Sequence, residues 1–207
     1  MSSMRRLFAA AAGFFIAFTG MVRAEIQPVL VSPVVPSGPN FAFNYRADLS
    51  GDSRLDPAAS NGITTVGPGG TLIQTNPPGT FFTIYDIPGL QSVVVSAPGW
   101  AATVQALGIT PSNINASFDS PTLVNVTFSY TGPVVAGPVS LTGFQIVSSF
   151  SGVNANGAFS DQFTNNTGAS SGLTGQSVGA VAIPTPEPAG MGLLALGAAG
   201  LFARRRS

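Results

Sequence analysis

Alternation of apolar and polar residues is the feature that most restricts what this chain can fold into. In residues 41–48, FAFNYRAD, every second side chain is apolar, and the same repeat runs through residues 122–131. A period of two places successive side chains on opposite faces of an extended strand, so one face packs on a core and the other meets water. The enrichment in Val, Thr and Phe also favours strands over helices.

Proline and glycine separate these segments in the way that turns require. Pro88-Gly89 and Pro98-Gly99 divide three strand-like runs, and we predict tight reversals of a meander there. The predicted strands cover residues 29–35, 41–48, 71–74, 81–87, 91–97, 100–107, 122–131, 141–151, 158–164 and 177–183, with a polar, glycine-rich loop over 165–176. We therefore expect an all-β fold, an antiparallel β-sandwich of jelly-roll type, with an all-β barrel as the alternative.

The N-terminal segment is typical of a secretory signal. Arg5 and Arg6 precede twelve apolar residues, 7–18, and the small residue Ala24 stands at a cleavage position. We predict that residues 1–24 are a signal peptide and that signal peptidase cuts between Ala24 and Glu25. A signal anchor that stays in place is the alternative, although twelve residues are few for a bilayer core about 30 Å thick.

The C-terminal segment combines three parts. Pro186-Glu187-Pro188 precedes fifteen mostly apolar residues, 189–203, and Arg204, Arg205 and Arg206 follow them. Fifteen helical residues extend about 23 Å, which predicts a short transmembrane helix in transient contact with the inner membrane. The arginines favour the cytoplasmic side and leave the preceding domain outside.

This order of parts resembles the PEP-CTERM sorting signal of exported bacterial proteins, over residues 184–207. In that family an exosortase, a membrane protease, recognises and removes the tail, and the protein goes to the cell surface or the extracellular polysaccharide matrix. The resemblance implies that Pro186, Glu187 and Pro188 form the recognition motif and that Arg204, Arg205 and Arg206 form its basic end. It implies nothing about the activity of the domain that the tail carries.

Residues 25–183 remain as one domain, and composition excludes several functions for it. The chain has no Cys, His or Lys, which excludes the usual zinc sites, thiol nucleophiles, Ser-His-Asp triads and Schiff-base lysines. The net charge of zero hides an acidic middle. Residues 25–186 hold two arginines and seven acids, which gives −5, so we expect no binding to nucleic acid.

Two candidate sites remain in the domain. Asp48, Asp52 and Asp56 surround Gly51; we expect a solvated loop in which Arg54 is the local charge partner, with an oxygen-ligand site for Ca²⁺ as the alternative. Trp100 follows a turn, where we expect a partly buried side chain; stacking on a sugar ring is the alternative. We expect Asp86 to lead into the Pro88-Gly89 turn; as the alternative it is a candidate catalytic carboxylate, but acid–base work needs a second carboxylate that the sequence does not identify.

The leading hypothesis is a non-enzymatic, structural or adhesive protein of the cell surface or extracellular matrix. A carbohydrate- or calcium-binding module is the alternative, and a secreted hydrolase that uses carboxylates alone is a weaker one. The partners expected are signal peptidase, an exosortase-type protease and extracellular polysaccharide.

Overall fold

The computed structural model describes residues 25–58, 65–66, 72–74 and 79–187. The predicted signal peptide, residues 1–24, lies outside the described residues, as do Pro188, the apolar segment 189–203 and the three terminal arginines. The described parts of the chain include no helix long and apolar enough to cross a membrane.

Thirteen strands make up the described fold. They are β1 (Ile26–Ser37), β2 (Asn40–Leu49), β3 (Ser53–Leu55), β4 (Thr65–Val66), β5 (Leu72–Gln74), β6 (Phe81–Ile87), β7 (Leu90–Val95), β8 (Trp100–Gln105), β9 (Val124–Tyr130), β10 (Val135–Ala136), β11 (Val139–Ser148), β12 (Gly152–Asn165) and β13 (Thr174–Thr185). A 3-10 turn at Gly168–Ser170 lies between the last two strands, within the predicted loop.

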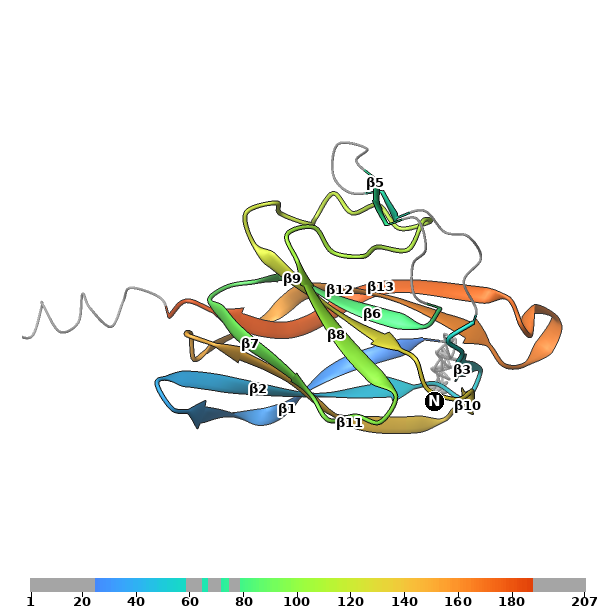
Figure 1. The fold of residues 1–207 in the computed structure, drawn as a ribbon, viewed down its shortest axis with the longest axis horizontal. Helices are drawn as coiled ribbons and strands as arrows, with labels where there is room; N and C mark the ends of the chain where they lie inside the picture. Colours follow the sequence, from blue (N-terminus) through green and yellow to red (C-terminus); the bar gives the residue numbers. More distant parts are fainter. Residues whose placement is uncertain (1–24, 59–64, 67–71, 75–78, 188–207) are drawn as a thin grey trace, which may run out of the picture.

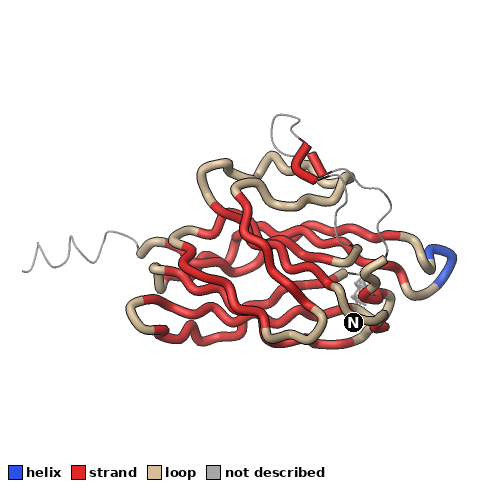
Figure 2. The backbone as a smooth tube through the Cα atoms, viewed as in Figure 1, coloured by secondary structure: helices blue, strands red, loops and turns tan. Residues whose placement is uncertain are grey.

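Two antiparallel sheets pack face to face (Figures 1 and 2). Sheet A has the order β1-β2-β11-β7, and sheet B has the order β10-β3-β12-β6-β9-β8 with β13 beside β12. Strands β4 and β5 form a small separate pair. The all-β antiparallel sandwich predicted from the sequence is therefore confirmed.

Period-two alternation sets which side chains enter the core. In β2 the side chains of Phe43, Tyr45 and Ala47 are buried, whereas those of Asn44 and Arg46 lie on the outer face and are half-buried. A one-residue slip in register would exchange these two sets, so the pattern specifies how β2 pairs with its neighbours.

In β9 the same alternation gives a different result. Val126 and Phe128 are buried as predicted, but Asn125 and Thr127 are buried too. The segment 106–123 crosses the outer face of sheet B, where Thr83 Oγ1 donates a hydrogen bond to the carbonyl of Ile109 at 2.7 Å (Figure 1). Segment 106–123 therefore covers the middle of the outer face of sheet B, and the polar side chains beneath it, such as Thr83 and Asn125, bond within the protein instead of to water.

The two Pro-Gly turns are present, with φ of +63° at Gly89 and +75° at Gly99, but the predicted meander is wrong. Strand β6 lies in sheet B, β7 pairs with β11 in sheet A, and β8 returns to sheet B beside β9. Each turn thus carries the chain from one sheet to the other. Only long-range pairing distinguishes this arrangement from a hairpin, because the local turn chemistry is the same.

Aromatic rings fill the centre of the core. Phe82 stacks on Phe128 with ring centroids 4.9 Å apart, and it meets the edges or tilted faces of Trp100 and Phe144 at 5.5 and 5.3 Å. Rings at these separations add attraction beyond the area that they bury. Because the chain has no cysteine, packing of this kind replaces the disulfides that many exported domains use.

Candidate functional site

The sorting tail begins inside the last strand. Pro184 pairs with Val153 and Thr185 pairs with Gly152, so the first two residues of the tail belong to β13. Ser151 Oγ donates a hydrogen bond to the carboxylate of Glu187, which is exposed like Pro186. The folded sandwich therefore leads into the Pro-Glu-Pro sequence without an intervening linker.

The predicted mature N-terminus lies where the first strand begins. The amide of Glu25 donates to Ser50 Oγ at 3.2 Å, and the amide of Ser50 donates back to the Glu25 carbonyl at 3.1 Å. Strand β1 starts at the next residue, Ile26, and its side chain is fully buried. The predicted cut after Ala24 would thus remove nothing from the described core.

A buried carboxylate ties this N-terminal end to sheet B. Asp161 of β12 accepts the backbone N–H of Ile26 at 2.5 Å on Oδ2, and it accepts the N–H of Ser177 at 2.8 Å and the Ser177 hydroxyl on Oδ1. Burial raises the pKa of Asp161 to about 7, and the nearby charge of Glu25 acts in the same direction. Three donated hydrogen bonds oppose this rise.

The three aspartates of the candidate calcium site each have a different partner. Asp48 forms a bidentate ion pair with Arg46, with both N–O distances at 2.7 Å, and also accepts the hydroxyl of Ser140. This ion pair holds the pKa of Asp48 below its usual value. No group of three metal-binding side chains gathers anywhere in the described residues.

The other two carboxylates bond across loops. Asp52 accepts the hydroxyl of Thr167 at 2.8 Å, which connects the β2–β3 turn to the β12–β13 turn. Asp56 pairs with Arg54 at 3.2 Å, the local charge partner expected from the sequence. In place of a shared cavity, the structure gives these aspartates turn-closing and cross-strand roles.

Trp100, the candidate for sugar stacking, lies in the core. Its side chain is 8% exposed, and it packs against Tyr130 and Phe144 with ring centroids 5.2 Å from each. The turn before it does place it at a strand start, but its indole faces other rings in the protein and not solvent.

Asp86, the candidate catalytic residue, has a second carboxylate nearby that the sequence did not identify. The N–H of Asp86 donates to Asn125 Oδ1 at 2.7 Å, and Asn125 Nδ2 donates to Asp119 Oδ1 at 2.8 Å. Burial is the main cause that raises the pKa of both carboxyls, and the charge of Asp86 also raises the pKa of Asp119.

This carboxylate pair holds the loop that covers sheet B. Asp119 is 4% exposed and accepts the N–H of Gly108 at 2.8 Å, while Asp86 accepts the N–H of Ser120 at 3.0 Å. Asp86 has φ of +52°, at the point where the β6–β9 register shifts. These bonds satisfy backbone donors of the 106–123 segment, which gives buried Asp119 and half-buried Asp86 a structural role.

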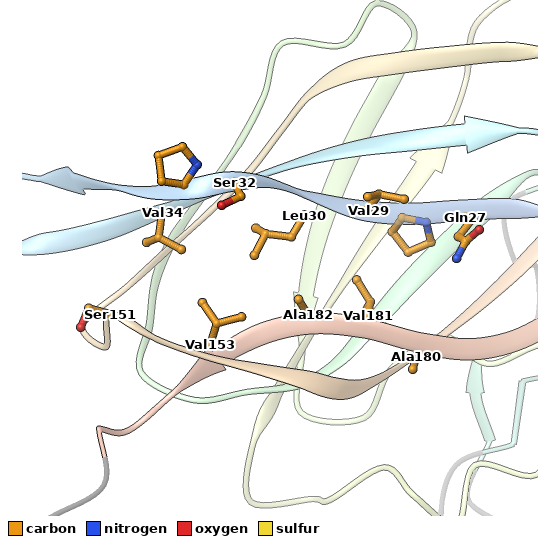
Figure 3. Close-up of a pocket in the computed structure, with 12 residues that line it drawn as sticks. Gln27, Val29, Leu30, Ser32, Val34, Ser151, Val153, Ala180, Val181 and Ala182 are labelled. Atoms are coloured by element: carbon orange, nitrogen blue, oxygen red, sulfur yellow. The ribbon is translucent and has the colours of Figure 1, made fainter.

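A groove of about 610 Å³ lies between the edges of the two sheets (Figure 3). Figure 3 shows Leu30 and Val34 of β1 facing Val153 of β12 and Val181 and Ala182 of β13 across it. Its lining is uncharged and mainly apolar. Pro28 and Pro33 lie along β1 beside it, and proline at a sheet edge discourages pairing with another chain because it removes donors.

Comparison with known proteins finds the PEP-CTERM protein-sorting motif at residues 184–206. No curated protein and no solved structure matches the chain. The match covers the Pro-Glu-Pro sequence and the arginine cluster and confirms the resemblance noted from the sequence. By its C-terminal sorting motif, then, this chain is an exported protein of the kind that exosortase sorts, and the domain that precedes the motif is an antiparallel β-sandwich.

Proposed function

We propose that the protein is a non-catalytic structural or adhesive component of the cell surface or extracellular matrix. Signal peptidase cuts after Ala24, the tail holds the chain briefly at the inner membrane, and an exosortase-type protease then releases the sandwich. The observation that supports this most is the direct join between β13 and the Pro-Glu-Pro sequence. Removal of the tail beyond Glu187 leaves every described strand intact.

The buried acids support a structural role for the domain. Asp119 and Asp161 each satisfy backbone N–H groups that would otherwise lose hydrogen bonds on folding. The tyrosine hydroxyl of Tyr85 acts similarly, because it bonds with Thr110 at 2.7 Å and with Ser160 at 2.6 Å. Polar groups inside this sandwich therefore form hydrogen bonds that hold separate segments of the chain together.

Sorting is tested in the native host by two tail variants, Glu187→Ala and the triple change of Arg204, Arg205 and Arg206 to Ala. We expect the wild-type protein outside the cell with the mass of a chain that has lost its tail. Each variant should stay with the membrane fraction at a higher mass. Asp52→Ala, which removes an exposed carboxylate far from the tail, serves as the control. Unchanged mass and location of both tail variants would refute the sorting step.

The non-catalytic role is tested by complementation of a strain that lacks the protein. Asp86→Asn removes the charge of the one acid that the sequence singled out for catalysis, and it keeps the acceptor oxygen for Ser120. If the domain is structural, this variant restores matrix cohesion as well as the wild type does. A folded variant that restores nothing would favour the carboxylate hydrolase instead.

A further inference from the structure

The two outer faces of the sandwich are unlike each other. Segment 106–123 covers the middle of the outer face of sheet B, where Tyr85 OH and Thr83 Oγ1 both donate to the carbonyl of Ile109. On the outer face of sheet A, Val31 of β1 is 43% exposed and Val94 of β7 is 49% exposed. Within the described part of the chain, the outer face of sheet A is thus open on its strands, whereas the open outer positions of sheet B lie on β8 and β13, where Val178 is 52% exposed.

A groove of about 290 Å³ crosses this open face. Its lining comes from all four strands of sheet A and the turn after β7: Val31, Asn44, Tyr45, Val94, Ser96, Thr142, Gly143, Phe144 and Gln145. Register places four of these side by side, because Val31 pairs with Asn44, Asn44 pairs with Gln145 and Gln145 pairs with Val94. Three strand spacings make this row about 14 Å long.

A bulge hollows the face beside this row. Gly143 has φ of +101°, and the β11–β2 register shifts between Thr142 and Phe144. A Cβ atom at this position would come within 2.6 Å of Ser96 Oγ and 2.7 Å of the backbone nitrogen of Ala97. Glycine therefore keeps the two strands close, and no side chain at 143 fills the groove.

Two amides form the polar centre of the row. Gln145 Nε2 donates to Asn44 Oδ1 at 2.8 Å, which fixes the orientation of both side chains. The N–H donors on Asn44 Nδ2 and the acceptor Gln145 Oε1 have no hydrogen-bond partner among the described residues. The hydroxyls of Thr142 and Ser96 also line the groove, and none of its nine residues is charged.

We infer that this groove binds a neutral polysaccharide chain, an inference that rests on the proposed adhesive role. Sugar hydroxyls both donate and accept hydrogen bonds, and paired amides offer both functions side by side. The C–H faces of sugar rings pack on apolar side chains, which Val31 and Val94 supply at the two ends of the row. An acidic polysaccharide fits poorly, because residues 25–186 carry a formal charge of −5, no cation lines the groove, and the neighbouring Arg46 is ion-paired with Asp48.

Affinity electrophoresis tests this with the full chain in a detergent that has no sugar head group. Native gels contain dextran, laminarin or galactomannan as neutral probes and alginate as the acidic probe. The test variant combines Asn44→Ala with Gln145→Ala, which leaves the core untouched. The control combines Gln91→Ala with Asn156→Ala, two exposed amides outside the groove.

We expect at least one neutral polysaccharide to retard the wild type and the control equally. The test variant should bind that polysaccharide about tenfold more weakly or worse, with an unchanged melting temperature. Three results would overturn the inference: no retardation by any neutral probe, equal retardation of the test variant, or retardation by alginate alone. Each leaves the sorting experiment untouched, so a protein that is sorted but does not bind would refute the groove and keep the proposed function.

Discussion

Asp161→Asn probes the contact that ties the N-terminal end of sheet A to sheet B. Ile26 and Ser177 donate their N–H groups to different oxygens of this carboxyl group. An asparagine side chain has one acceptor oxygen, so one buried N–H would face an NH₂ group and lose its acceptor. A buried donor without a partner costs about 1–3 kcal/mol. At pH 5 the carboxyl is protonated, but its hydroxyl oxygen still accepts, which the NH₂ group of asparagine does not, so we expect the variant to lose that much unfolding free energy.

The pH dependence of the unfolding free energy tests the role of Asp161 more specifically than the loss at a single pH. Burial raises the pKa of Asp161 from 3.8 to about 7, so the folded protein holds a proton that the unfolded chain releases above about pH 4. This contribution to stability is therefore present in full at low pH and is lost as the pH rises through 7. Linkage gives a loss of about 2–3 kcal/mol between pH 5 and pH 8.

Urea unfolding at pH 5, 6, 7 and 8 measures this loss. Asp86 and Asp119 also have raised pKa values and add a slope of the same sign, so the informative quantity is the wild-type value minus the variant value. We expect this difference to shrink by about 2–3 kcal/mol from pH 5 to pH 8. Gln91→Ala, a surface change that involves no titrating group, should leave it flat. A constant difference for Asp161→Asn would refute the argument.

Two further predictions concern the core and the aspartate loop. Phe82→Ala removes the ring that contacts Trp100, Phe128 and Phe144. It should lower the free energy of unfolding, measured in urea, by about 3–5 kcal/mol. The control Val104→Ala, at an exposed position, should change that free energy by less than about 0.5 kcal/mol. A loss below about 1 kcal/mol for Phe82→Ala would contradict the described core. Asp48 and Asp56 are paired with arginines, so melting temperatures in calcium and in chelator should agree within about 1 °C. A clear rise of the melting temperature in calcium would instead support a calcium site at this loop.

Local patterns in the sequence predicted the strands but not their partners. The alternation over residues 41–48 and the Pro-Gly turns correctly located β2, β6, β7 and β8. Two- and three-residue strands such as β3 and β10 were missed, because so few residues show no period. The assignment of β7 to sheet A depends on its pairing with β11, about fifty residues later, and no local signal carries that information.

The candidate sites also divide into features that can be read along the sequence and features that only the fold creates. The tail was recognised from its own residues, because a sorting motif is read along the chain. Burial of Trp100 and the approach of Asp119 to Asp86 depend on elements that meet only in the folded protein. The amide pair Asn44–Gln145 joins residues 101 positions apart, and neither position stands out in sequence.

The crossed pairing of distant segments also dictates when this protein can finish folding. Strands β1 and β2 can join as soon as they emerge, but Ser140 bonds to Asp48 from 92 positions away and Asp161 reaches Ile26 from 135 positions away. Contacts so far apart in the chain form slowly, because long loops must close first. A chain exported as an extended thread could thus form the β1–β2 hairpin early, but it would complete the two sheets only after β12 and β13 have crossed the membrane. Both sheets would be complete only once Glu187 has crossed the membrane, so the exosortase would act on a domain that has just finished folding.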